Sequence, residues 1–270
     1  MKTVQVHGVS LATVDRGSGR PVLLVHAFPL DHSMWDAQIS ALAAHYRVIA
    51  PDLRGFGRSQ VTEGTVTMEQ FADDLAGLLD ALGVAEPVVY CGLSMGGYIG
   101  WQFYRKYASR LRGMILCDTR AIADTPEVRA MRKEMIDRVV AEGPEPVAQA
   151  MIPKLLSSST IASRPETVAG VHRMILANDR QGIAAAIRGM RDRPDCTPLL
   201  ARFRCPCLVF VGKLDAISTL EEMRTIAAKI PGAKLVTIAG AAHLTPVEQP
   251  AQTTAAMEAF LGGLEGAVKR

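Results

Sequence analysis

The chain has 270 residues, and 49% of them are hydrophobic, so it is long enough for one large domain with a sizeable core. Its 30 basic and 27 acidic residues leave a net charge of +3 with no dense basic run, which argues against a nucleic-acid partner. No apolar run approaches the roughly 20 residues of a membrane span or forms a signal-peptide core at the N-terminus. Five cysteines without a C-x-x-C pair favour neither a disulfide framework nor a zinc site. We therefore expect a soluble, reduced, cytoplasmic protein without a metal, a cofactor or a membrane association.

Strand-like and helix-like runs alternate along most of the chain, which predicts an α/β fold with a mainly parallel sheet and helices on both faces. The first two segments, 3–6 and 11–15, predict an antiparallel hairpin. Thr67 and Gln70 predict a capping box before a helix that runs to about Leu82, where Gly83 ends it. The last helix should start after Pro250 and end near residue 262. The other predicted strands span 21–26, 47–50, 88–91, 111–117, 207–211 and 234–238.

One stretch, 119–195, breaks the alternation, because it has helical periodicity and no convincing strand. Proline and glycine divide it into about four helices. We interpret it as a helical cap inserted into a core domain made of residues 1–118 and 196–270. The alternative is an additional helical layer that has no part in substrate choice.

The hexapeptide Gly92-Leu93-Ser94-Met95-Gly96-Gly97 lies between a strand-like run and a helix-like run. A G-x-S-x-G sequence in this context predicts a nucleophile elbow, a tight turn that exposes the serine hydroxyl to a partner base. Glycines on either side allow the sharp bend and the close approach of neighbouring elements. An incidental serine in a glycine-rich turn is the alternative, and we favour the nucleophile.

A serine hydroxyl needs a base within hydrogen-bond reach and an acid that orients this base. In the elbow architecture the order along the chain is Ser, acid, His, which leaves His172, in the cap, and His243 as candidates for the base. We assign His243, because it follows strand 234–238 at the carboxyl edge of the sheet, where reactive groups gather. Asp215, just past strand 207–211, is the predicted acid, and Asp118, at the end of strand 111–117, is the alternative acid.

An oxyanion hole needs two rigid donors, which are normally backbone N–H groups. Met95, directly after the nucleophile, supplies one of them. The second should come from the loop His26-Ala27-Phe28-Pro29, where Phe28 N–H is the best candidate because Pro29 has no N–H. His26 is expected to brace this loop and not to react.

Five ordered motifs resemble the α/β-hydrolase superfamily over nearly the full chain. They are His26–Pro29, Asp52–Ser59, Gly92–Gly97, Gly212–Asp215 and His243–Pro250. The chain is most similar to carboxylesterases and 3-oxoadipate enol-lactonases, which share the Gly-Leu-Ser-Met-Gly-Gly elbow. It departs from the superfamily at Ala27 and Ala242, where glycine is usual. In the second motif, Asp52 and Arg54 are expected to brace loops near the site.

The resemblance implies an esterase-type serine hydrolase and argues against two related activities. Epoxide hydrolases and haloalkane dehalogenases of the superfamily carry aspartate where this chain has Ser94. Enol-lactone hydrolases, perhydrolases and C–C bond hydrolases share the triad and remain alternatives. A ligand receptor on the same scaffold is the remaining alternative from a different class.

The composition of the stretch 119–195 bears on the substrate. It contains no aromatic residue, its basic and acidic side chains nearly balance, and it holds Met131, Met135, Met151, Met174 and Met190. We expect most of these methionines to pack the cap against the core. Whichever apolar residues face Ser94 must be aliphatic or thioether, which favours a modest aliphatic acyl chain. The expected partner is therefore a small-molecule ester of short to medium acyl chain, hydrolysed through an acyl-enzyme intermediate.

Overall fold

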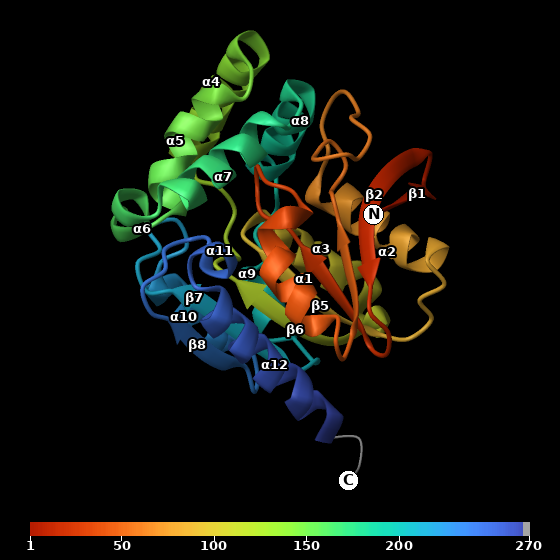
Figure 1. Cartoon of the computed structure of the whole chain (residues 1–270). Coiled ribbons are helices and arrows are strands. Elements are labelled where there is room, and N and C mark those ends of the chain that lie inside the picture. The colour runs from red at the N-terminus through yellow and green to blue at the C-terminus, as the bar shows by residue number, and fades with distance from the viewer. Residues whose placement is uncertain (267–270) are drawn as a thin grey trace.

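The computed structural model describes residues 1–266, which form an eight-stranded sheet with helices on both faces (Figure 1). The strands lie in the order β1-β2-β4-β3-β5-β6-β7-β8. The two pairings at one edge of the sheet, β1 with β2 and β2 with β4, are antiparallel, and the others are parallel. The predicted α/β class and mainly parallel sheet are confirmed. The strands are β1 (Lys2–Val6), β2 (Val9–Arg16), β3 (Pro21–Val25), β4 (Arg47–Pro51), β5 (Val88–Leu93), β6 (Leu111–Cys117), β7 (Cys207–Gly212) and β8 (Lys234–Ile238).

Each face of the sheet has its own apolar core. On β3, Leu23 and Val25 belong to one core and Val22 and Leu24 to the other, because successive side chains of a strand point to opposite faces. Helices α2 (Met68–Ala81), α3 (Met95–Tyr107) and α10 (Leu220–Lys229) cover the first face, whereas α1 (Asp36–Leu42) and α12 (Pro250–Gly266) cover the second. Coverage of both faces explains why the central strands are apolar at almost every position.

Several short elements escaped the sequence prediction. They are η1 (His32–Trp35), α1, η2 (Ala108–Arg110), α9 (Thr197–Leu200), α10 and α11 (Thr245–Glu248). Thr67 accepts the hydrogen bond from Gln70 N–H at the start of α2, but the reciprocal pair of a full capping box is formed by Thr219 and Glu222 at α10. Helix α12 extends to residue 266, beyond the predicted end near residue 262. No helix within residues 1–266 combines the length and the apolar character that crossing a membrane requires.

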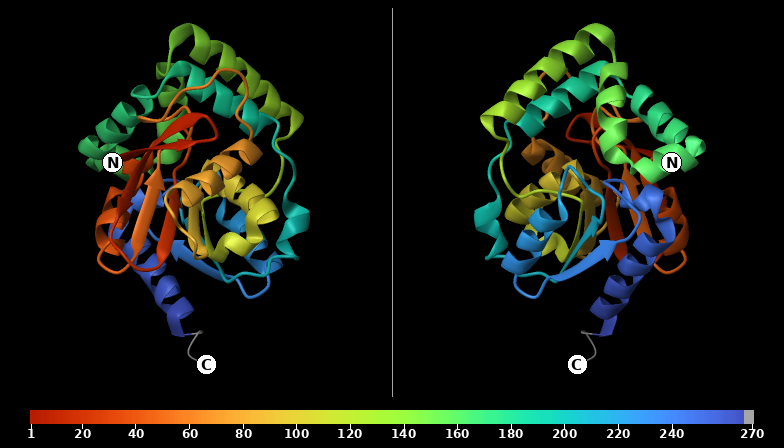
Figure 2. Two further views of the ribbon diagram at one scale, coloured as in Figure 1. Left: turned by 90° about the vertical axis from the view of Figure 1, so that its right-hand side faces the viewer. Right: turned by 90° about the vertical axis from the view of Figure 1, so that its left-hand side faces the viewer.

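Residues 119–195, which interrupt the alternation of strands and helices, contain five helices and no strand (Figures 1 and 2). They are α4 (Pro126–Glu142), α5 (Glu145–Leu155), α6 (Ser158–Ser163), α7 (Pro165–Leu176) and α8 (Arg180–Arg191). There are five and not four because Ser157 caps a short helix before Pro165 starts the next one. In both views of Figure 2 these helices lie together at one end of the sheet, away from the end of α12.

Helix α8 lies very close to the core. The Cα of Gly182 approaches the Gly55 carbonyl so closely that a side chain at Gly182 would collide with it. The Val66 N–H donates to the Ala185 carbonyl at 3.2 Å, one turn further along α8. Backbone contact on this side therefore holds the five-helix segment against the loops that follow β4.

Candidate active site

Ser94 occupies the turn between β5 and α3 with φ 53° and ψ −110°. A residue with a Cβ rarely adopts this conformation, and such outliers cluster at functional sites. The flanking glycines have a packing reason to lack side chains. A Cβ on Gly92 would strike the Gly96 carbonyl, and one on Gly96 would strike the Val25 carbonyl. The local sequence thus builds the turn that the elbow pattern predicts.

His243 and Asp215 face each other beyond the carboxyl ends of β8 and β7. The Nδ1 atom of His243 lies 2.8 Å from Asp215 Oδ2, and both side chains are buried. The other carboxylate oxygen of Asp215, Oδ1, accepts hydrogen bonds from the N–H groups of Ile217 and Ser218 at 2.7 and 3.1 Å. These bonds orient the carboxylate. An Nδ1–H that donates to Asp215 leaves Nε2 unprotonated, as a general base requires.

Asp118, the alternative acid, directs its carboxyl group to other partners. Its Oδ1 accepts the Gly212 N–H at 2.7 Å and its Oδ2 accepts the Thr245 hydroxyl at 2.8 Å. Its side chain is fully buried. Burial, the negative charge of Asp215 and a hydrogen bond between the two carboxyl groups raise the pKa of Asp118 well above its usual value. The geometry therefore places Asp215, and not Asp118, against the ring of His243.

The two predicted oxyanion donors belong to different segments beside Ser94. Met95 is the first residue of α3, and the first N–H groups of a helix have no partner within that helix. Phe28 lines the same cavity as Ser94. The Ala27 methyl group that replaces the usual glycine is fully buried, and Ala27 N–H lies 3.2 Å from Met34 Sδ.

His26 is hydrogen-bonded inside the loop that carries Phe28. Its Nδ1 donates to the Ala27 carbonyl at 2.9 Å, and its Nε2 accepts the Leu53 N–H at 2.9 Å. Complete burial lowers the pKa of His26, which keeps the ring neutral. These two bonds tie the Phe28 loop to the segment after β4.

A cavity of about 430 Å³ opens at Ser94 between the sheet and the five helices. Its volume lies within the usual range for small-molecule sites. The core contributes Phe28, Ser94 and Tyr98 to the lining, among others. Four of the five cap methionines also line it, which is more than the sequence led us to expect: Met131, Met135, Met151 and Met190.

Charged side chains of the cavity are mostly neutralised by ion pairs. Arg120 pairs with Glu222 at 2.6 Å. Asp124 accepts hydrogen bonds from both Arg132 and Arg193, so this group keeps one positive charge. Lys154 also lines the cavity, and its side chain has no ion-pair partner within residues 1–266. The cavity wall thus carries more positive than negative charge.

Two buried polar residues that the sequence did not single out connect the five-helix segment to the loops that carry Phe28 and His243. Asn178, between α7 and α8, donates to the Pro29 carbonyl at 2.8 Å and accepts the Gly57 N–H at 2.7 Å. Glu248 accepts the N–H and hydroxyl of Ser157 at 2.8 and 2.7 Å and the Ala242 N–H at 2.6 Å. A single sequence offers no signal for Asn178, whereas Glu248 falls inside the motif that begins at His243.

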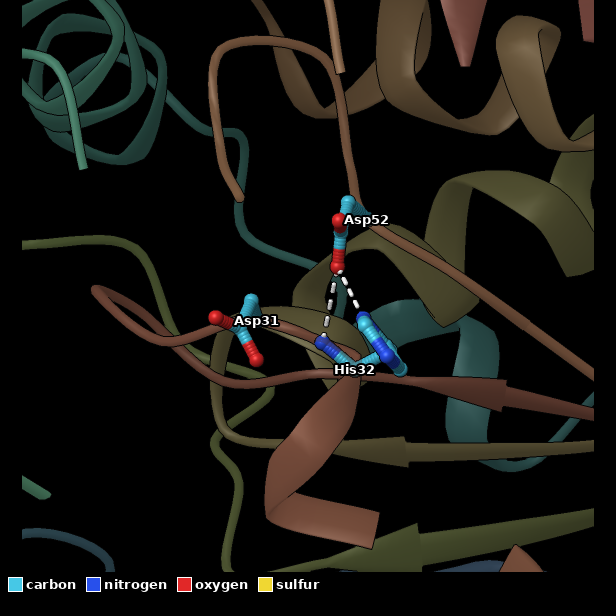
Figure 3. A group of neighbouring side chains, drawn as sticks. All are labelled: Asp31, His32 and Asp52. Carbon is cyan, nitrogen blue, oxygen red and sulfur yellow. Dashed lines mark hydrogen bonds and ion pairs between the residues drawn. The ribbon is translucent and has the colours of Figure 1, made fainter. Parts of the chain in front are cut away.

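In the described part of the chain, two groups of side chains bring potential metal ligands within 4.8 Å of one another: Asp31 with His32 and Asp52, and Asp118 with Asp215 and His243. Figure 3 shows the first, in which the ring and the N–H of His32 both point to Asp52 Oδ1, at 2.5 and 3.0 Å. The Asp31 carboxylate instead accepts the N–H and hydroxyl of Ser33. Internal hydrogen bonds thus account for the first group, which braces the loop between β3 and η1.

The His32 ring is mostly buried against Asp52. Burial alone would lower the pKa of His32, but the hydrogen bond and charge of Asp52, together with the charges of Asp31 and Asp36, raise it. Asp52 behaves in the complementary way. Burial opposes ionisation, yet the His32 ring and the N–H groups of Arg58 and His32 hold the pKa of Asp52 below its usual value. The Asp52 segment therefore braces loops beside the site, in the role that the resemblance implied.

Comparisons with known proteins agree with this architecture. A structure of a thermophilic esterase from Thermogutta terrifontis, with malate bound, superimposes with a TM-score of 0.95 at 48% identity, covering 97% of this chain and 98% of the other. The enol-lactonase from Burkholderia xenovorans LB400 gives a TM-score of 0.90 at 29% identity, with 97% and 100% coverage. The curated 3-oxoadipate enol-lactonase 2 of Acinetobacter baylyi is 26% identical over 96% of this chain and 95% of its own length. The sequence profile described as "alpha/beta hydrolase fold" matches residues 20–250, and the protein therefore belongs to the α/β-hydrolase family and is a hydrolase.

Proposed function

We propose that the protein is a carboxylesterase-type serine hydrolase that cleaves esters of short to medium acyl chain. In this proposal Ser94 is the nucleophile, His243 the base and Asp215 the acid. Residues 119–195 act as a cap that closes the acyl pocket over a core of residues 1–118 and 196–270. The observation that carries the proposal is the strained Ser94 turn, which opens into a cavity whose apolar side chains from residues 119–195 are all thioether or aliphatic.

The proposed reaction starts when Ser94 Oγ attacks the ester carbonyl carbon and His243 Nε2 takes the hydroxyl proton. The oxyanion that forms would be stabilised by the N–H groups of Met95 and Phe28. The tetrahedral intermediate then expels the alcohol, which receives the proton from His243, and leaves an acyl group on Ser94. A water molecule activated by His243 hydrolyses this acyl-enzyme and restores the serine.

Ser94→Ala tests the proposal directly, because the substitution removes only the hydroxyl oxygen. We expect hydrolysis of p-nitrophenyl butyrate to be abolished while the circular dichroism spectrum and Tm stay close to those of the wild type. A serine-directed phosphonate should label Ser94 and no other residue. Turnover by the alanine variant at the normal rate would exclude the nucleophile role. Ligand binding by the wild type without turnover would favour a receptor.

Hydrolysis of a carboxylate-bearing lactone is the second candidate. Lys154 and the Asp124 group leave positive charge on the cavity wall, and two of the compared relatives are named enol-lactonases. If this candidate is correct, Lys154→Met should raise KM for an anionic lactone and leave kcat/KM for neutral p-nitrophenyl esters unchanged. An equal KM for the lactone in Lys154→Met and wild type would exclude a role for this lysine in substrate choice.

A further inference from the structure

Two residues at and just past the end of β6, Cys117 and Thr119, contact the backbone of the elbow. Strand β6 lies between β5, which leads to Ser94, and β7, which leads to Asp215. The Ser94 N–H donates to the Cys117 carbonyl at 3.0 Å, and the Thr119 hydroxyl donates to the Ser94 carbonyl at 2.8 Å. The strained Ser94 conformation is therefore held on both sides by the segment 117–119.

The middle residue of this segment, Asp118, contacts the two loops that carry the acid and the base. Gly212, which donates to Asp118 Oδ1, lies three residues before Asp215. Thr245, which donates to Asp118 Oδ2, lies two residues after His243. Asp118 itself adopts a positive φ of 44°, a conformation that a non-glycine residue keeps only where its surroundings impose it.

We propose that Asp118 is a positioning residue, whose buried carboxyl group joins Gly212 to Thr245 and thereby sets the spacing between Asp215 and His243. The proposal rests on the triad of the proposed function and gives Asp118 a task other than that of the alternative acid. Without its carboxyl group, the two loops would still be joined by the hydrogen bond between Asp215 and His243 and by the bond from the Leu214 N–H to the Ala241 carbonyl at 2.9 Å, but neither bond reaches Thr245, beyond His243.

The protonation state of Asp118 fits this role. Burial and the charge of Asp215 raise the pKa of Asp118 well above its usual value, which favours the protonated carboxyl group and the hydrogen bond that it donates to Asp215. The titratable groups around it are Asp215, His243 and the adjacent Cys117 thiol, whose own pKa is raised by burial and by neighbouring charges. Loss of the donated bond would leave more negative charge on Asp215 and would stabilise protonated His243. The acidic limb of the pH profile of kcat/KM should then move to higher pH.

Three variants test the proposal with p-nitrophenyl butyrate and with the rate at which a phosphonate labels Ser94. Asp118→Ala removes both bridges and should lower kcat and the labelling rate by about 10²-fold, with KM little changed. Asp118→Asn keeps an acceptor for Gly212 and an N–H donor, so it should stay within about tenfold of wild type and keep the wild-type acidic limb. Thr245→Val removes one bridge at nearly constant shape and should have an intermediate effect.

Thr253→Val is the matched control. It removes a buried hydroxyl that donates to the Thr245 carbonyl at 2.9 Å and makes no bond with Asp118. We expect this control to lower Tm and to leave kcat unchanged. Unchanged kcat in Thr245→Val or in folded Asp118→Ala would overturn the proposal. If Asp118→Ala does not fold, the kcat values of Thr245→Val and Asp118→Asn still test whether Asp118 positions the two loops.

A loss in Asp118→Asn as large as that expected for the triad acid would also overturn the proposal, because it would identify Asp118 as the acid. Failure of the proposed function has a different signature. It would appear in the unsubstituted protein, as the absence of phosphonate labelling at Ser94, and would overturn both proposals together.

Discussion

At Ser94 the cost of the backbone conformation, of order 1–3 kcal/mol, is offset by a specific set of contacts. The residue donates its N–H to Cys117, accepts the Thr119 hydroxyl and lies beside glycines that let β3 and α3 approach. These contacts hold the hydroxyl group in one place before any substrate arrives. Preorganisation of this kind is what the attack step requires.

The assignment of the acid leads to a quantitative prediction. Asp215→Asn should lower kcat by on the order of 10⁴-fold, because an amide favours the wrong tautomer of His243. Asp118→Asn should cost far less. Steady-state kinetics of the two variants side by side check this difference. A reversed order of the two effects would place the acid at Asp118.

The pair of His32 and Asp52 predicts how stability depends on pH. The folded state raises the pKa of His32, so the pair stabilises the fold below the unfolded pKa of about 6.5 and this contribution is lost as pH rises through the folded pKa. His32→Asn keeps a donor for Asp52 but cannot titrate. Chemical denaturation at several pH values between 6 and 9 should show a flatter decline of the unfolding free energy for this variant than for wild type. If the unfolding free energy depends on pH in the same way in both proteins, His32 is not the group whose loss of a proton destabilises the fold.

At the scale of elements, the proposed cap is hydrogen-bonded both to the loop that carries Phe28 and to the loop that carries His243. Asn178 joins the turn between α7 and α8 to the loop that carries Phe28. Glu248, on α11, joins the turn between α5 and α6 to the loop that carries His243. Both side chains are almost completely buried. Movement of the cap would therefore break buried hydrogen bonds next to the predicted oxyanion donor and the predicted base.

Asn178→Asp tests the first of these connections. The new carboxylate can still accept the Gly57 N–H but would face the Pro29 carbonyl without a proton to donate. We expect the unfolding free energy to fall by about 1–3 kcal/mol. We also expect kcat to fall with little change in KM. Loss of the bond to the Pro29 carbonyl would displace the neighbouring Phe28 N–H, which is the proposed oxyanion donor.

Asp179→Asn is the control for this variant, since it changes a neighbouring exposed residue and asparagine caps α8 as well as aspartate does. Its kcat and stability should stay close to wild type. An Asn178→Asp variant that loses stability but keeps the wild-type kcat would show that the bond only fastens the cap.

For the whole molecule, the cavity exists because the cap and the carboxyl edge of the sheet come together, and neither could form it alone. Its volume of about 430 Å³ and its four methionines favour a flexible, modest acyl chain. With acetate, butyrate, octanoate and palmitate p-nitrophenyl esters, kcat/KM should be highest at the shorter chains. The Ser94→Ala variant provides the background rate. A maximum at palmitate, or a strong preference for a dicarboxylic lactone over every neutral ester, would contradict the short-chain ester assignment.

The local pattern of the chain was sufficient for the fold class and for the order of the strands along the sequence. Apolar runs bounded by glycine and proline mark the strands, and the G-x-S-x-G turn marks the elbow, because both depend on interactions between near neighbours. Short elements such as η1 and α11 have too few residues for a periodic signal, so they were not predicted. The family resemblance followed from motifs of the same local kind.

Only the tertiary structure decided which distant groups meet. Asp118 and Asp215 both follow strand ends, and the sequence could rank them but could not show that His243 Nδ1 points to Asp215 while Asp118 bridges Gly212 and Thr245. Likewise, composition could not separate the methionines that line the cavity from Met174, which does not. The reason is that side-chain contacts between segments depend on the packing of all the elements together, whereas secondary structure and turns depend largely on residues close along the chain.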